Sequence, residues 1–239
     1  MGEGVALGID VGTTRIKAEV VRLDAAELHC EAASTPWRQG SDGLQVDPDE
    51  LGDVAVSVAA AAADWAEAGG HRVVAIGVTG MAETGALLDA CSRPLAPAFA
   101  WHHTMGDPDR VQEALGRQHF IVTTGRDCSI SPSIIKLDVL RQRGHRFTRG
   151  QRWLNIPDYV AWRLCGVQAA EISPSPRTGL VDIAAGTWWD EALEFLGAGR
   201  WLLPGAPAPG GTLLGRPLPP RPPPLPPPSV APQGAGHPA

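Results

Sequence analysis

The sequence predicts an α/β fold built around a mixed sheet. Three short segments with strand character come first, at residues 5–11, 16–23 and 27–33, and a long Ala-rich helical segment follows them. A continuous apolar run at 73–78 comes soon after the helix. Closely spaced strands pair antiparallel and strands joined through a helix run parallel, so this order predicts both kinds of pairing in one sheet.

The first three segments predict an antiparallel meander. Residues 5–11 are a short apolar run that ends in a Gly-Thr-Thr turn. In 16–23, apolar residues alternate with Lys17 and Glu19, which is the period of two that a strand shows when one face is buried. Residues 27–33 follow closely and predict the third strand.

The helical segment has a sequence signal at each end. Asp47 occupies the capping position, Pro48 the first helical position, and two acidic residues follow in the first turn, where they complement the helix dipole. Alanine-rich sequence carries the helix to about residue 68, and two glycines end it. The run 73–78 is typical of a parallel strand that is buried on both faces.

Shorter elements are predicted beyond this strand. Residues 87–89 have the character of a further short strand, and Trp153 begins another that leads into a helix. Helices are expected at 107–117, 132–143 and 157–164, because each segment has a proline or an acidic residue near its N-terminus.

The composition changes abruptly near residue 216. Nine of the thirteen residues from 216 to 228 are proline, which fixes φ and removes a backbone donor at each position. We therefore expect residues 1–216 to form one domain and residues 217–239 to form a disordered or polyproline II tail. A second interpretation of the tail is an SH3 ligand, because residues 216–222 fit the pattern R-x-x-P-x-x-P.

Composition and charge exclude several classes of protein. Of the 239 residues, 44% are hydrophobic and 19% are charged, so the chain can bury a core and is not disordered throughout. A net charge of −6 argues against nucleic-acid binding, which needs a basic face. The four cysteines lack the C-x-x-C spacing of metal sites, and no apolar run is long enough to span a membrane. The start has no signal-peptide pattern, so we expect a cytoplasmic protein with neither nucleic-acid nor membrane partners.

Asp10, Gly12, Thr13 and Thr14 form the first candidate site. They come at the end of the first apolar strand, where a glycine turn brings backbone N–H groups near a phosphate and two hydroxyls can donate to its oxygens. The carboxylate of Asp10 could hold Mg²⁺ through water. The alternative is an ordinary hairpin with a polar tip.

A second candidate site follows the strand at 73–78. Glu83 lies in the turn after this strand, where the ligands of α/β sheets bind, and it could accept hydrogen bonds from the hydroxyls of a polyol. The alternative for Glu83 is a solvated turn acid. Trp101 could stack on a sugar or fill the core, and the two adjacent histidines beside it make a poor metal site. Since both strands are expected in one sheet, we predict that Asp10 and Glu83 open onto the same face.

Six segments, in this order, resemble one family. They read LGIDVGTTRIK, VTGMAETGALLD, PLAPAFAWHHT, SPSIIKL, WLNIPDYVAWRLCG and SPRTGLVDIAAGTWWDEAL. Together they look like the N-terminal domain of the FGGY carbohydrate kinases, and the resemblance covers about residues 6–216. It implies a ribonuclease H-like domain of the actin-like ATPase type and a second domain that holds the adenosine. It also implies phosphorylation of a sugar or polyol hydroxyl with ATP and Mg²⁺ as cofactors.

For the phosphate side of the catalytic site, the resemblance implies roles for four residues. Asp10 matches the carboxylate that acts on Mg²⁺ and on the transferred phosphoryl group. Gly12, Thr13 and Thr14 match the family's first phosphate loop, so the resemblance implies that they bind ATP.

For the sugar side, the resemblance implies that Ala82 and Glu83 contact the substrate. Trp101 and His103 lie in the segment that matches the family's W-x-D-x-R pattern, and we expect them to line the same site. Two residues depart from this pattern, because His103 replaces its Asp and Met105 replaces its Arg. These departures predict fewer polar contacts to the sugar.

In this family the general base lies beyond the matched segments, in a Gly-Gly-x-Asp turn. This sequence has no Asp or Glu after Glu194, so we expect a truncated kinase that lacks the base and the ATP-binding domain and is inactive alone. A separate C-terminal kinase half is then a candidate partner, beside the small-molecule sugar or polyol. The alternative function is a non-catalytic fragment that binds a sugar or a partner protein.

Overall fold

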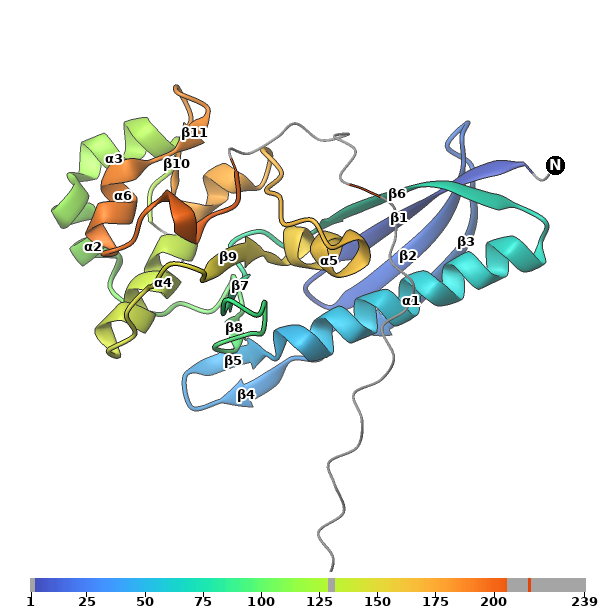
Figure 1. Ribbon diagram of the computed structural model, residues 1–239, viewed down its shortest axis with the longest axis horizontal. Coiled ribbons are helices and arrows are strands. Elements are labelled where there is room, and N and C mark those ends of the chain that lie inside the picture. The colour runs from blue at the N-terminus through green and yellow to red at the C-terminus, as the bar shows by residue number, and fades with distance from the viewer. Residues whose placement is uncertain (1–2, 129–131, 206–214, 216–239) are drawn as a thin grey trace, which may run out of the picture.

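The computed structural model describes residues 3–128, 132–205 and 215, and Figure 1 shows how its elements are arranged. The predicted Pro-rich tail at 217–239 lies outside these described residues. Within the described part of the chain, no helix is both long enough and apolar enough to cross a membrane.

A four-stranded mixed sheet carries the N-terminal part of the chain. Its strands are β1 (Gly4–Val11), β2 (Arg15–Arg22), β3 (Glu27–Ser34) and β6 (Arg72–Gly80), in the order β3-β2-β1-β6. β1 pairs antiparallel with β2, and β2 with β3, which confirms the predicted meander. β6 pairs parallel with β1, as expected for a strand that is reached through a helix.

α1 (Pro48–Ala68) lies across one face of this sheet (Figure 1). Asp47 caps the helix as predicted, because its carboxylate accepts hydrogen bonds from the N–H of Asp49 at 2.8 Å and of Glu50 at 3.4 Å. Every second residue of β1 and β2 is buried in the core between sheet and helix. This core includes Val5, Leu7, Ile9, Ile16, Ala18, Val20, Leu51, Ala55 and Ala62.

A second helix, α5 (Ile156–Cys165), packs beside α1 and against β6. It follows β9 (Arg152–Asn155), which pairs antiparallel with β7 (Gly85–Leu88). The buried side chains of α5 extend the same core; they are Ile156, Tyr159 and Val160. The short strand and the helix predicted for these segments are therefore confirmed.

The remaining helices form a second core at the other end of the molecule (Figure 1). They are α2 (Pro108–Leu115), α3 (Arg117–Thr124), α4 (Ser133–Gln142) and α6 (Asp190–Phe195), with the hairpin of β10 (Val181–Asp182) and β11 (Thr187–Trp188). The helix predicted at 107–117 ends early, because Gly116 has a φ of 78° that breaks it, and α3 begins directly afterwards. The smaller elements are β4 (Arg38–Gly40), β5 (Gly43–Val46), β8 (Ala98–Phe99) and the 3-10 turns η1 (Ser175–Thr178) and η2 (Arg200–Leu202).

β6 differs from the prediction in its burial. Its apolar run predicts a strand covered on both faces, yet none of its nine residues is buried. Val73, Ile76 and Val78 pack partly against the core on the α1 side. The residues that alternate with them are exposed, because β6 is the edge of the sheet and its far face is uncovered among the described residues. The expectation of burial on both faces is therefore wrong for this structure.

Candidate active site

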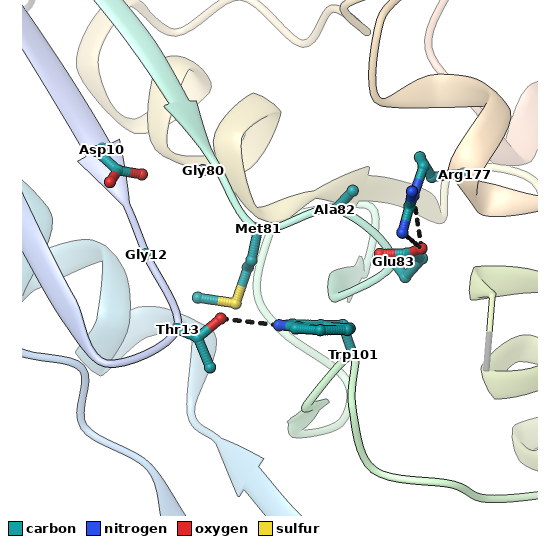
Figure 2. Close-up of a pocket in the computed structure, with 9 residues that line it drawn as sticks. All are labelled: Asp10, Gly12, Thr13, Gly80, Met81, Ala82, Glu83, Trp101 and Arg177. Atoms are coloured by element: carbon teal, nitrogen blue, oxygen red, sulfur yellow. Dashed lines mark hydrogen bonds and ion pairs between the residues drawn. The ribbon is translucent and has the colours of Figure 1, made fainter. Parts of the chain in front are cut away.

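The carboxyl ends of β1 and β6 lie side by side at one end of the sheet, where they line a pocket of about 290 Å³ (Figure 2). Its lining consists of Asp10, Gly12, Thr13, Gly80, Met81, Ala82, Glu83, Trp101 and Arg177. The prediction that Asp10 and Glu83 open onto the same face is therefore confirmed. Figure 2 shows them on opposite sides of the pocket, with Met81 and Trp101 between them.

Three side chains brace the turn between β1 and β2. Thr35 Oγ1 donates to the carbonyl of Gly12 at 2.8 Å, and Trp37 Nε1 donates to the carbonyl of Thr13 at 2.6 Å. Trp101 Nε1 donates to Thr13 Oγ1 at 2.8 Å, and Figure 2 shows this bond as a dashed line between the two lining side chains. Because two carbonyls and one hydroxyl of the turn are bound by the protein, the turn is held in one conformation beside the pocket.

Close backbone contacts fix the ends of both strands. A Cβ at Gly12 would lie 2.7 Å from the carbonyl oxygen of Arg15, and a Cβ at Gly80 would lie 2.5 Å from that of Val11. Both positions therefore need glycine. Asp10, one residue before the end of β1, is exposed and lines the open part of the pocket.

Glu83 is 2% exposed, and its backbone has a left-handed φ of 61°. Residues other than glycine rarely adopt this conformation, and those that do cluster at functional sites. Its Oε1 accepts from Arg126 Nη1 at 3.0 Å and from Arg177 Nε at 2.7 Å. The two guanidinium groups offset the cost of burying the carboxylate. The alternative of a solvated turn acid is therefore wrong for Glu83.

The backbone of Glu83 is held by α4. Lys136 Nζ donates to the carbonyl of Glu83 at 2.8 Å, and Ser133 Oγ donates to the same oxygen at 3.3 Å. Lys136 is fully buried, and this burial lowers the pKa of its amine to about 7, although the negative charge of Glu83 acts in the opposite direction. Side chains from α4, from η1 and from the segment after α3 thus hold both the carboxylate and the carbonyl of Glu83.

Among the charged residues that line the pocket, Arg177 is the one that the sequence analysis does not identify as a site residue. It lies in η1, its side chain is 50% exposed, and it reaches Glu83 from 94 positions further along the chain. A buried glutamate is stabilised by a cationic partner, so the burial of Glu83 implies that a lysine or arginine lies beside it. Nothing in the sequence says which arginine is that partner, and Arg126 and Lys136 were missed for the same reason.

The other predicted site residues fall into two groups. Ala82 and Trp101 line the pocket as expected. Thr14 is exposed and is not among the residues that line the pocket. His103 packs against the β4–β5 turn instead: its Nε2 is 1.9 Å from where a Cβ on Gly43 would lie.

The donors around Asp10 fit Mg²⁺ bound together with a nucleotide. Among the described residues, no group of three or more His, Cys, Asp or Glu side chains could hold a metal ion by itself. Mg²⁺ in nucleotide sites takes one or two carboxylates and completes its shell with water and phosphate oxygens. A single exposed carboxylate beside a glycine turn suits that arrangement.

Residues 5–207 match the FGGY family of carbohydrate kinases, N-terminal domain. The chain belongs to this family. The resemblance drawn from the six sequence segments is therefore confirmed.

Glycerol kinases are among the curated relatives of this FGGY chain. It is 31% identical over 231 residues to the glycerol kinase of Rhodospirillum centenum, which covers 89% of this chain and 46% of that protein. It is 29% identical over 210 residues to the glycerol kinase of Bradyrhizobium diazoefficiens, which covers 83% of this chain and 42% of that protein. The FGGY chain thus spans less than half the length of these relatives.

Solved structures of sugar kinases share the fold. A xylulose kinase from Rhodospirillum rubrum superposes with a TM-score of 0.75 at 23% identity, over 84% of this chain and 42% of that one. A glycerol kinase from Plasmodium falciparum, solved with ADP, superposes with a TM-score of 0.72 at 18% identity, over 85% and 43%. At these identities the likeness concerns the fold alone, and it confirms the expected ribonuclease H-like, actin-like ATPase architecture.

Proposed function

We propose that this FGGY chain provides the sugar pocket and one side of the phosphate site of a kinase that phosphorylates a sugar or polyol hydroxyl. The observation that carries the proposal is the pocket itself. It places Asp10 and the braced turn at one end and Glu83 with Arg177 at the other. Phosphoryl transfer depends on holding the phosphate and the accepting hydroxyl in one place and in line.

Asp10 and the β1–β2 turn act at the phosphate end. The N–H groups of a glycine turn donate to phosphate oxygens, and Asp10 would hold Mg²⁺ through water. When bound, ATP with Mg²⁺ supplies the phosphoryl group and neutralises its charge. The bonds from Thr35, Trp37 and Trp101 fix the turn beforehand, so little reorganisation is needed when a phosphate arrives.

Glu83, Ala82 and Trp101 act at the sugar end. Oε1 of Glu83 accepts from Arg126 and Arg177, which orient the carboxylate, and in this proposal the carboxylate accepts a hydrogen bond from a substrate hydroxyl. Trp101 offers a ring face for the C–H groups of the substrate, and Arg177 offers a partly exposed donor. Glu83 and Arg177 are thus the polar side chains offered to the sugar, which agrees with the loss of polar contacts expected from His103 and Met105 in place of the family's Asp and Arg.

A further polypeptide would complete the site. Among the described lining residues the carboxylates are Asp10 and Glu83, and Glu83 is paired with two arginines. We therefore assign the general base and the adenosine pocket to a separate C-terminal half, equivalent to the part of the relatives that this chain does not span. Losing a general base typically costs ~10²–10⁴-fold in rate, so the chain alone should have no useful kinase activity.

The test mixes the chain with the C-terminal half of the Rhodospirillum centenum glycerol kinase in an ATP-coupled assay. The acceptors are glycerol, xylulose and gluconate, and turnover is expected only when both parts are present. Asp10→Asn should lower kcat of the mixture by about 100-fold or more with little change in the KM for the acceptor. The matched control is Asp24→Asn, an exposed aspartate in the β2–β3 turn, which should change neither value.

Three outcomes would contradict the proposal. Turnover by the chain alone that Asp10→Asn abolishes would show that no second half is needed. Equal losses in kcat and in acceptor affinity would give Asp10 another role. Binding of an acceptor without turnover in the mixture would favour the non-catalytic fragment.

A further inference from the structure

Trp101 lies between the two ends of the pocket and is bonded to one of them. Figure 2 shows its indole between Thr13 and Glu83, with the nitrogen turned toward Thr13. Trp101 Nε1 donates to Thr13 Oγ1 across 88 positions of the chain. The half-buried ring also packs against the core between the sheet and α1. A side chain on the wall between the acceptor and the phosphate is therefore tied to the β1–β2 turn.

Two tryptophans donate to Thr13, and they hold different parts of it. Trp37 Nε1 donates to the backbone carbonyl, while Trp101 Nε1 donates to the side-chain hydroxyl oxygen. Thr35 holds the neighbouring carbonyl of Gly12. Thr35 and Trp37 are not among the described lining residues, so the backbone of the turn is braced from outside the pocket. The hydroxyl of Thr13 is held by Trp101, which does line the pocket.

The bond from Trp101 determines how the Thr13 hydroxyl can act. An indole N–H is a donor only, so Oγ1 is the acceptor in this bond, and the hydroxyl keeps its own hydrogen to donate. Among the residues that the structure describes, none accepts that hydrogen. A hydroxyl that already accepts one hydrogen bond donates a stronger one, because successive bonds polarise each other. The Thr13 hydroxyl is thus prepared to donate to an oxygen of a ligand in the pocket.

Aromatic packing holds the Trp101 indole in this orientation. The imidazole of His102 meets it edge to face, with ring centroids 5.3 Å apart, and meets Trp37 in the same way at 6.5 Å. The pocket side of the indole is where the C–H groups of an acceptor would lie. An acceptor there restricts the indole further and so keeps Nε1 on Thr13.

We propose that Trp101 is a positioning residue that couples the two ends of the pocket; this inference rests on the proposed function. Its ring meets the acceptor, and its N–H holds Thr13 Oγ1 so that the hydroxyl hydrogen is directed at the phosphate. Each ligand then stabilises the arrangement that the other needs, so acceptor and phosphate bind more tightly together than separately. Because a coupling free energy is reciprocal, both affinities rise by the same factor. The net strength of one hydrogen bond corresponds to a factor of roughly 3 to 10.

Isothermal titration calorimetry on the full chain measures this factor. Glycerol and xylulose are the acceptor probes, and tripolyphosphate with Mg²⁺ is the phosphate probe. Saturating magnesium tripolyphosphate should lower the Kd of the acceptor by about 3- to 10-fold. Trp101→Phe keeps an aromatic ring without the N–H, so the factor should fall to about 1.

Trp37→Phe is the matched control, because it also removes one indole N–H from Thr13. That donor holds the carbonyl, so its loss should weaken tripolyphosphate binding equally with and without the acceptor and leave the coupling factor unchanged. A merely structural brace would lower the midpoint of unfolding in both tryptophan variants without separating their coupling factors.

Thr13 supplies a second pair of variants that leaves the aromatic packing intact. Thr13→Val keeps the shape of the side chain but removes the hydroxyl, so the coupling should be lost. Thr13→Ser keeps the hydroxyl and should retain the coupling. Combining Trp101→Phe with Thr13→Val should remove no more coupling than either change alone, since both break the same bond.

The outcomes distinguish this inference from the proposed function. Independent binding of an acceptor and of tripolyphosphate by the original chain would overturn the coupling and leave the proposed function in place. A factor that persists in Trp101→Phe, or that is lost equally in Trp37→Phe, would overturn the role of Trp101. Failure of the chain to bind any of the three probes would refute the proposed function and this inference together.

Discussion

Replacing Asp158 by Asn should remove a pH dependence from the free energy of unfolding. Asp158 lies in the first turn of α5, is 7% exposed, and accepts a hydrogen bond from the N–H of Glu171 at 3.1 Å. Glu171 in turn accepts from Ser175 through its carbonyl, at the start of the turn that carries Arg177. The carboxyl group thus supports the segment that brings Arg177 to the pocket.

The size of the effect follows from the burial of Asp158. Burial raises the pKa of this carboxyl from 3.8 to about 7, and the nearby charge of Glu171 acts in the same direction, while its N–H and Asn155 act against it. Between pH 5 and 7 the native state therefore keeps a proton that the unfolded state has lost. Stability must fall as the pH rises through this window, by up to ~1.4 kcal/mol per unit and about 3 kcal/mol in total.

Urea unfolding at pH 5, 6, 7 and 8 measures this difference. The Asp158→Asn variant should gain up to about 3 kcal/mol relative to the original protein between pH 5 and pH 8, because the amide does not ionise. Asp64→Asn, an exposed position on α1, is the control and should follow the original curve. Parallel curves for the original protein and Asp158→Asn would refute the reasoning, since they would mean that Asp158 is ionised throughout this range.

Three further predictions concern stability, and denaturant midpoints check each of them. Trp101→Phe keeps an aromatic ring but removes the N–H that donates to the β1–β2 turn, and it should lower the free energy of unfolding by about 1 kcal/mol. An unchanged midpoint would contradict this. Asp47→Ala removes the cap of α1 and should also cost about 1 kcal/mol, and an unchanged midpoint would contradict this. Gly80→Ala forces a Cβ to within 2.5 Å of the carbonyl oxygen of Val11 and should cost about 2 kcal/mol. Gly77→Ala, which meets open space, should cost clearly less.

The sequence predicts the sheet and its first helix well because their signals are local. The alternation around Lys17 and Glu19, the capping aspartate and the two glycines after α1 each act within a few residues of the element that they define. Asp10 and Glu83 could be placed on one face for the same reason, since each comes at or just after the end of a strand in one sheet. The partners of Glu83 could not be predicted, because Arg126 and Arg177 lie 43 and 94 positions away and no local pattern links them to it.

Two misjudged positions have physical explanations. The match to the family's W-x-D-x-R segment implies that Trp101 and His103 line one site, but His103 is not among the residues that line the pocket and its imidazole lies against Gly43. The apolar run of β6 predicts burial on both faces, yet the described chain supplies cover on only one.

Glu83 is the point at which stability and the proposed function conflict. A left-handed φ at a residue other than glycine costs roughly 1–3 kcal/mol, and a buried carboxylate adds a desolvation cost that glycine or alanine would avoid. The structure meets these costs with Arg126 after α3, Arg177 in η1, and a buried lysine and a serine in α4. A turn selected only for packing has no use for this arrangement. Its position opposite Asp10, in a pocket that the ends of β1 and β6 line together, supports the proposal that the carboxylate contacts a substrate.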